Sequence, residues 1–550
     1  MFLSTRSEKA PARLLGLRFR HARLAAAFMT LVMLAQVSVA QTAMGTAGIS
    51  SGALPSLGEN AELTAAAERR IGERIAASIY RDPDYIDDPV LEEYIQGIWQ
   101  PLMTAARARG ELHPELQERF AWDIFLIRDR TVNAFALPGG YFGVHLGLIS
   151  LVSDRDELAA VLGHELSHVT QRHIARLIAQ QKQQAPWLIG AMILGALAVG
   201  KNSQLGSAAM VGGQAAAAQG QLNFSRDMER EADRVGFGVM SDAGFDSRGV
   251  VSMFDKLQQG GRLNDNGAFP YLRSHPLNTQ RTAEVQARLQ LPPQSAANGS
   301  KTAEKPAAGN AAKLLVLHAM MASRARVLAD PGVDALRNMV SEAQRFAMPG
   351  FPEPTAPTEV RTASAIYAGA LAAARLRDFA LAQGLASKLG GLAANNPLAA
   401  RVLDLLSLEI DLMAGKVPDK AAQLDLTQAT SRADVLIGAQ ALLAAGRAQA
   451  VADRLQTWVA EHPKDALAWQ LLARANSSQN QRVRAIRAEA EGYVAQLDFA
   501  GALERFKAAQ TMMYTSPGSG DFVEGSIIDT RTRQVELLVK EQALQDKLDR

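Results

Sequence analysis

The stretch that decides the fold is His164-Glu165-Leu166-Ser167-His168. Histidines four residues apart leave the same face of a helix one turn apart, so their imidazole nitrogens can reach one ion at roughly 2.0–2.1 Å. Glu165 lies one step further round the helix, where its carboxylate can accept a proton from a metal-bound water without binding the metal. The stretch therefore predicts a metal site on a helix, and the alternative is a pair of histidines on a helix surface.

A second helical pattern, further along the chain, offers the remaining ligand. A catalytic zinc needs three protein ligands and an open position. Glu229 and Asp233 are four residues apart and therefore share a helix face. Glu229 can supply the third ligand, while Asp233 can hydrogen-bond the distal nitrogen of a ligating histidine. We expect Glu231 to be a solvated charge on another face, and the alternative for the whole cluster is an acidic helix without a metal.

The sequence around these motifs predicts an α+β domain, mostly helical with a small sheet, over residues 61–290. The period of the apolar residues changes along it from helical to alternating and back. The predicted elements are helices within 60–115, strands at 121–127 and 133–137, a strand or turn at 141–149, and a long helix at 154–183.

The N-terminus has the pattern of a cleavable signal peptide over residues 1–40. Six basic residues precede an uncharged apolar run that ends in Ser38-Val39-Ala40, and an uncleaved anchor is the alternative. Residues 41–60 would then be a flexible N-terminal segment. Cleavage removes six basic residues and one acidic residue and turns the net charge from +2 to −3, which gives no reason to expect nucleic acid as a partner. The chain has no cysteine, which excludes a cysteine peptidase, and a bacterial periplasm fits these features best.

Residues 187–220 are apolar and then rich in Gly and Ala. The uncharged part, 187–200, would span about 21 Å as a helix, short of the roughly 30 Å of a hydrocarbon core. We therefore disfavour a transmembrane helix. An active-site flap, or a surface that makes peripheral contact with a membrane or with unfolded substrate, remains open for this segment.

The C-terminal half predicts an all-α tetratricopeptide-type solenoid at 313–550, separated from the first domain by a Pro/Ala-rich linker at 291–312. Small residues follow two predicted turns at Ala382 and Ala450, 68 residues apart, which is twice the 34-residue tetratricopeptide period. A non-repetitive helical bundle is the alternative.

The motifs as a set resemble the HtpX/Oma1-type zinc endopeptidases, whose domain is zincin-like. The resemblance is carried by the histidine motif, the helix with Glu229 and Asp233, and the stretch Asn133-Ala134-Phe135-Ala136-Leu137-Pro138-Gly139-Gly140. It implies one Zn2+ per chain, bound by His164, His168 and Glu229, with Glu165 as general base. It also implies that Asn133, Ala134 and Phe135 bind substrate at a sheet edge.

Two further residues receive a role only through this resemblance. His275 matches a histidine that can occupy the fourth zinc position and hold the enzyme latent. Arg281 would contact the transition state, although an ordinary charge at a helix start is an equal alternative. His173 lies five residues beyond His168, and we expect it at the surface.

The order of signal peptide, peptidase domain and helical tail resembles the periplasmic envelope-assembly proteases of Gram-negative bacteria. That resemblance implies quality control of unfolded or stalled outer-membrane proteins, with the tail contacting these clients or the β-barrel assembly machinery. Two rivals remain open: a chaperone or scaffold whose peptidase is latent or secondary, and a secreted zinc hydrolase with a substrate other than protein.

Overall fold

The computed structural model describes residues 63–180, 226–263, 268–290, 308–348, 356–515 and 522–548. The predicted signal peptide, residues 41–60, the segment 187–220 and most of the linker lie outside these ranges, so their assignments stay predictions. Within the described ranges, no helix combines the length and the apolar character needed to cross a membrane.

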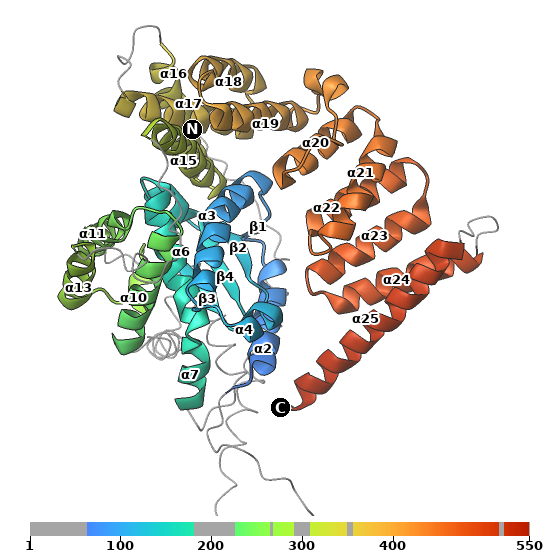
Figure 1. Ribbon diagram of the computed structural model, residues 1–550. Helices are drawn as coiled ribbons and strands as arrows, with labels where there is room; N and C mark the ends of the chain where they lie inside the picture. The colour runs from blue at the N-terminus through green and yellow to red at the C-terminus, as the bar shows by residue number, and fades with distance from the viewer. Residues whose placement is uncertain are drawn as a thin grey trace, which may run out of the picture. The chain divides into compact units, whose positions relative to one another are not determined.

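A four-stranded sheet forms the centre of the N-terminal region, in the order β1-β2-β4-β3 (Figure 1). β2 and β4 are parallel, and β3 pairs with β4 in antiparallel register, with Ala134 opposite Val144. β3 therefore lies at an edge, which is the position predicted for it. The strands are β1 Tyr85–Ile86, β2 Asp123–Ile127, β3 Ala134–Leu137 and β4 Tyr141–His145.

Both faces of the sheet are covered by helices. Alternate residues of the strands therefore pack into two different hydrophobic clusters, one on each face. Ile124 and Leu126 of β2 pack in the cluster that contains Trp99 of α3, whereas Phe125 and Ile127 pack against apolar residues of α2 and α7. Every residue of β4 is buried as a result. The α+β prediction is confirmed. The helices around the sheet are α2 Ala65–Tyr80, α3 Pro89–Ala108, α4 Pro114–Arg119, α5 Leu146–Leu151, α6 Arg155–Thr170 and α7 His173–Gln180.

Two predicted elements end earlier than expected. The strand or turn predicted at 141–149 is a strand only to His145, after which α5 begins. The helix predicted at 154–183 breaks after Thr170, and Arg172 adopts a left-handed φ of 53° before α7 starts. Four further helices lie among the described residues of this region: α10 Arg226–Asp242, α11 Arg248–Leu263, α12 Tyr271–Ser274 and α13 Thr279–Leu289.

The C-terminal region is entirely helical in its described residues (Figure 1). Its elements are α15 Ala308–Leu328, α16 Val333–Phe346, α17 Ala356–Arg375, α18 Phe379–Ala393, α19 Pro397–Met413, the 3-10 helix η3 Asp419–Gln423, α20 Arg432–Ala444, α21 Ala448–Glu461, α22 Ala466–Ser478, α23 Arg482–Ala495, α24 Phe499–Thr515 and α25 Phe522–Leu548. α15 begins at Ala308, inside the predicted linker. α20 and α22 start 34 residues apart, as do α21 and α23, which is compatible with the predicted tetratricopeptide-type solenoid.

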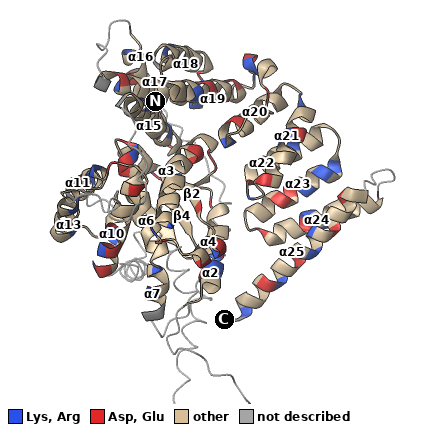
Figure 2. Cartoon of the chain, viewed as in Figure 1, with Lys and Arg blue, Asp and Glu red and all other residues tan. Residues whose placement is uncertain are grey.

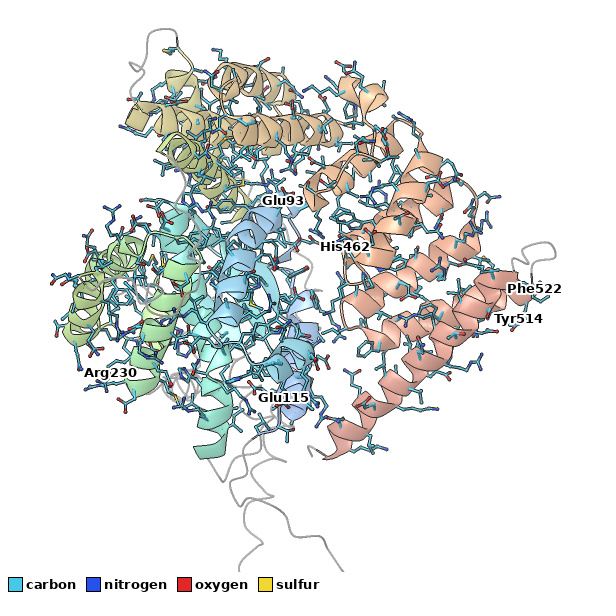
Figure 3. The ribbon with its side chains drawn as sticks, viewed as in Figure 1. Glu93, Glu115, Arg230, His462, Tyr514 and Phe522 are labelled. Carbon is cyan, nitrogen blue, oxygen red and sulfur yellow. The ribbon has the colours of Figure 1, made fainter. Side chains whose placement is uncertain are left out.

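Arginines of this tail meet the acidic start of α3 (Figure 2). Arg324 of α15 donates to Asp88 Oδ2 at 2.7 Å, Arg401 of α19 lies 2.6 Å from Glu93 Oε1, and Arg432 of α20 lies 2.8 Å from Asp87 Oδ1. Glu93 is labelled in Figure 3. The N-terminal region and the tail therefore share charged contacts as well as one hydrophobic core.

Candidate metal centre

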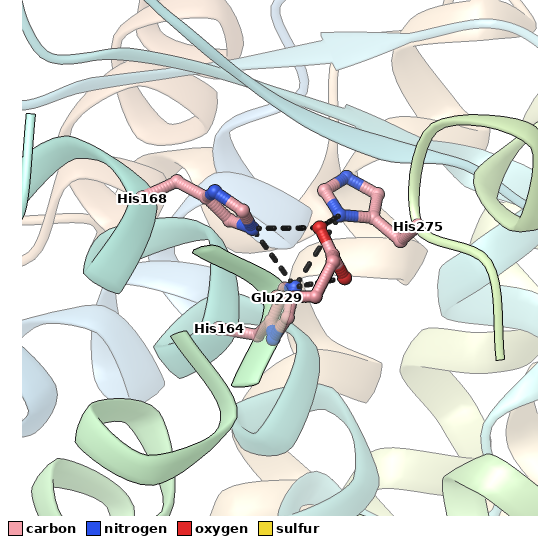
Figure 4. A group of neighbouring side chains, drawn as sticks. All are labelled: His164, His168, Glu229 and His275. Atoms are coloured by element: carbon pink, nitrogen blue, oxygen red, sulfur yellow. Dashed lines mark hydrogen bonds and ion pairs between the residues drawn. The ribbon is translucent and has the colours of Figure 1, made fainter. Parts of the chain in front are cut away.

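Four buried side chains from three places in the chain converge on one point (Figure 4). His164 and His168 come from α6, Glu229 from α10, and His275 from the residue after α12. Their candidate ligand atoms all lie within 4.8 Å of one another. The predicted ligands are thus brought together, although they are up to 111 residues apart in sequence.

The spacing of the ligand atoms fits one tetrahedral ion. Nε2 of His164 is 3.0 Å from Nε2 of His168 and 3.3 Å from Nδ1 of His275. Oε1 of Glu229 is 3.4 Å from Nε2 of His168 and 3.0 Å from Nδ1 of His275. Bonds of roughly 2.0–2.1 Å to a tetrahedral zinc place its ligands about 3.3 Å apart. The donor set and its spacing therefore suit a single zinc ion.

The two helices that carry the ligands approach closely at a pair of glycines. A Cβ on Gly236 of α10 would lie 3.0 Å from the backbone of Gly163 in α6. Glu229, Asp233 and Gly236 are spaced by four and three residues, so they occupy one face of α10. This crossing places the carboxylates of α10 beside the histidines of α6.

Asp233 lies at the distal nitrogen of the first histidine. Its Oδ1 is 3.0 Å from Nδ1 of His164, and both of its oxygens accept hydrogen bonds from Arg281, at 2.7 and 2.8 Å. Nη1 of Arg281 also lies 2.7 Å from Oε2 of Glu229. Arg281 is only 3% exposed, so the alternative of an ordinary charge at a helix start is wrong. A contact with the transition state stays a prediction.

The carboxylates set the protonation of the metal-free cluster. Burial alone would lower the pKa of His164, but its bonds to Asp233 and Glu229 raise that pKa to about 10. Burial lowers the pKa of His168. Burial alone would raise the pKa of Glu229, yet the charge of His275 and hydrogen bonds from the histidines hold it far below its usual range. Glu229 is therefore ionised, as a metal ligand must be.

Glu165 of α6 is buried beside the same point. Its side chain is 2% exposed, and its Oε1 lies 3.4 Å from Nε2 of His275. In the part of the chain that the structure describes, neither carboxylate oxygen has a hydrogen-bond partner. A buried acceptor of this kind is suited to a water molecule held between it and a metal.

The spacing from His168 predicts His173 at the surface, and this prediction is wrong. Its side chain is fully buried, with Nδ1 2.9 Å from Nδ1 of His168 and Nε2 3.0 Å from Oε2 of Glu231. Glu231 is 31% exposed and also bonds to Arg176, so it is not a free solvated charge. The prediction failed because helical spacing applies only to an uninterrupted helix, whereas the chain turns at Arg172.

The predicted substrate strand lies at the sheet edge. The carbonyl of Asn133 accepts from the amide of His145 at 3.1 Å, so that pair faces β4. The antiparallel ladder then turns the backbone groups of Ala134 and Ala136 away from β4. The ring of Phe135 covers Gly143 of the neighbouring strand. Binding of substrate by these residues stays a prediction.

Residues 90–289 match peptidase family M48. This part of the chain is therefore an M48 metallopeptidase domain, and such peptidases depend on zinc.

The relatives in this class differ in how much of the chain they match. The chain is 29% identical to the β-barrel assembly-enhancing protease of Escherichia coli over 84% of its own length and 87% of that protein. It is 34% identical to a putative β-barrel assembly-enhancing protease of Vibrio cholerae, over 44% of this chain and about half (48%) of the relative. The mitochondrial metalloendopeptidase OMA1 of Arabidopsis thaliana is 31% identical over 30% of the chain and 31% of that protein.

Proposed function

We propose that this protein is an exported zinc endopeptidase that cleaves unfolded or stalled outer-membrane proteins in the periplasm. One observation carries the proposal. Nε2 of His164 is 3.0 Å from Nε2 of His168, and these nitrogens lie 3.5 and 3.4 Å from Oε2 and Oε1 of Glu229 respectively. Glu165 lies beside this cluster.

Each residue of the site has its own role in the proposed peptide hydrolysis. Bound zinc would polarise the scissile carbonyl and lower the pKa of its water to near neutrality. Glu165 accepts the proton of the attacking water and later delivers it to the leaving amine, a role for which its position next to the ligands is suited. Asp233 holds the ring of His164, and hydrogen bonds from Arg281 lower the pKa of Asp233 against the effect of its burial.

The edge strand supports an extended peptide as substrate. The backbone N–H and C=O groups of the half-buried Ala136 point away from β4 and can pair with another strand, whereas Ala134 is fully buried. Such pairing depends on backbone hydrogen bonds of the substrate rather than on its side chains, and it requires a substrate segment that is not folded. A β-barrel protein that has not yet closed offers strands of this kind.

The name of one relative supports the class of client, and the N-terminal sequence supports export. The Escherichia coli protein is a β-barrel assembly-enhancing protease, and it aligns with most of this chain. The signal-peptide pattern of residues 1–40 agrees with export. The tail would contact clients or the β-barrel assembly machinery, and Tyr514 and Phe522, which are 80% and 95% exposed, are candidates for such a contact (Figure 3).

Metal content and proteolysis test the proposal together. We expect wild type to bind one zinc per chain, and His164→Ala and Glu229→Ala to lose it. Glu165→Gln should keep the zinc but lose about 10²–10⁴-fold in the cleavage rate of an unfolded outer-membrane protein, the usual contribution of a general base. Full zinc in either ligand variant would refute the ligand assignment, and full activity in Glu165→Gln would refute the base.

A second candidate is a chaperone or scaffold in which the peptidase is latent. The observation in its favour is His275, whose Nδ1 lies 3.3 Å from His164 Nε2 and 3.0 Å from Glu229 Oε1, as a fourth ligand would. Complementation of envelope assembly separates the two candidates. If Glu165→Gln restores assembly as well as wild type in a strain that lacks this protein, cleavage is not the main role.

A further inference from the structure

The second histidine of the motif, His168, contacts another histidine through the ring nitrogen that faces away from the candidate ligands. Nε2 of His168 faces the other candidate ligands, 3.0 Å from Nε2 of His164, while its Nδ1 is 2.9 Å from Nδ1 of His173. Nε2 of His173 is 3.0 Å from Oε2 of Glu231, and Arg176 donates to the same oxygen at 2.8 Å. A line of contacts thus leads from His168 through the buried ring of His173 to the partly exposed ion pair of Glu231 and Arg176.

Metal binding by His168 determines which nitrogen of each histidine carries the proton. A ligating Nε2 carries no proton, so the proton of His168 is on Nδ1 and is donated to His173. The acceptor on His173 is then Nδ1, which leaves its own proton on Nε2. That proton is donated to Glu231, whose ionised carboxylate can only accept. Each contact along the line is then one hydrogen bond with one donor and one acceptor.

The backbone turns away from the helix to make this contact. In a continuous helix, a residue five positions after His168 would lie about 140° round the axis and point elsewhere. The chain instead ends α6 at Thr170, passes through the left-handed Arg172, and starts α7 with His173. A left-handed conformation is unfavourable for arginine, so surrounding contacts must hold it. Arg172 is held by Glu68 and by the carbonyl of Leu63.

We propose that His173 is a positioning residue for the zinc site, which fixes the ring and the tautomer of His168 and is itself oriented by Glu231. This proposal rests on the proposed function in taking His164, His168 and Glu229 as zinc ligands. It gives the two ligating histidines matching support. His164 is held by Asp233 with Arg281 behind it, and His168 is held by His173 with the Glu231–Arg176 pair behind it.

Two substitutions at position 173 separate positioning from packing. His173→Phe keeps a ring of similar volume but has no acceptor for the Nδ1 proton of His168. His173→Asn puts an amide oxygen near the place of the histidine Nδ1 and can still accept it. Zinc affinity is measured on the full chain by competition with a chromogenic chelator, and cobalt(II) absorption reports the geometry of the bound ion.

We expect His173→Phe to lower zinc affinity by about 10–100-fold and to alter the cobalt spectrum, the usual result of removing such a support. His173→Asn should recover most of the affinity and the wild-type spectrum. His318→Phe is the matched control. His318 is also buried, but it bonds to Tyr94 and to the carbonyl of Val152 in another part of the core, so zinc affinity should not change.

Wild-type affinity in His173→Phe, or equal losses in His173→Phe and His173→Asn, would overturn the proposal. If His173→Phe does not fold, Glu231→Ala and Glu231→Gln decide instead. The glutamine oxygen can still accept from His173, so only Glu231→Ala should weaken zinc binding, and equal affinities would overturn the proposal. These assays contain zinc or cobalt and no substrate. A failure of the proposed proteolysis therefore leaves their result standing, and their failure does not refute proteolysis.

Discussion

The proposed latency of the site rests on His275. Its Nδ1 lies among the candidate ligands, and its Nε2 is 3.4 Å from Oε1 of Glu165. Its ring stacks on Tyr271 at 4.6 Å between centroids. With His275 as fourth ligand, the position that an attacking water needs is filled, and Glu165 faces an imidazole instead.

Removing that imidazole should open the site. We expect His275→Ala to raise the rate at which unfolded outer-membrane protein is cleaved by at least about tenfold, because minor open states are usually populated at about 0.1–10%. The zinc content should stay at one per chain. His462→Ala, in the tail, serves as a control that leaves the rate unchanged. A rate in His275→Ala equal to or below that of wild type would contradict a latent role for His275.

Residues on one helix could be related to one another from the sequence, because helical spacing is local. The pair His164 and His168, and the pair Glu229 and Asp233, each needed only a separation of four residues. The structure adds what spacing cannot give, namely that α6 and α10 cross with these faces toward one another.

The surroundings of the site were less accessible to sequence reasoning. His173 reaches His168 only because the chain leaves the helix at Arg172. The sequence has no glycine or proline at that turn from which it could have been predicted. Arg281 has the position of an ordinary residue in the first turn of a helix. Its burial depends on α13 packing against α10, which brings Asp233 and Glu229 to it from about 50 residues away.

At the scale of elements, the crossing of α6 and α10 determines the site. The closest approach is at Gly163 and Gly236, where the two backbones meet without side chains between them. A Cβ on Gly236 would lie 3.0 Å from the carbonyl of Gly163 and 3.1 Å from the amide nitrogen of His164. Backbone atoms in a packed helix cannot move aside cheaply, so α10 itself would have to shift.

That shift gives a prediction about metal binding. We expect Gly236→Ala to move Glu229 and Asp233 away from His164, to lower zinc affinity by about 10-fold or more, and to destabilise the fold by about 1–3 kcal/mol through overpacking. Chelator competition and thermal unfolding measure the two effects.

The matched control is Gly97→Ala in α3. A Cβ there meets nothing within 4 Å, so the substitution should stabilise the protein by about 0.5–1 kcal/mol through helix propensity. Unchanged zinc affinity in Gly236→Ala would show that the close crossing does not set the ligand positions.

The elements could be predicted where the apolar period was strong and less well where several strands and helices meet. β2 and β3 were expected close to their observed bounds, because alternation and the Pro138-Gly139-Gly140 turn are local signals. The end of β4 at His145 was not, since buried and mostly apolar residues continue without a break from β4 through Ile149 of α5. A continuous apolar run does not distinguish a buried strand from a buried helix.

At the scale of the whole molecule, buried and exposed ion pairs join the tail to the start of α3. Arg324 is 3% exposed, bonds to both oxygens of Asp88, and reaches Glu409 of α19. Arg401 makes a comparable pair with Glu93, but both side chains are about a third exposed. Arg324 and Asp88, like Arg401 and Glu93, are more than 200 residues apart, so no local pattern in the sequence could have paired them.

The difference in burial predicts a difference in stability. Arg324→Met should lower the free energy of unfolding by about 3–5 kcal/mol, because it leaves the charge of Asp88 buried without its partner. Arg401→Met should cost only about 0–1 kcal/mol, since water can solvate Glu93. Urea unfolding of the full chain, followed by tryptophan fluorescence, measures both values. Equal effects of the two substitutions would mean that the Arg324 pair does not hold the tail to the peptidase domain.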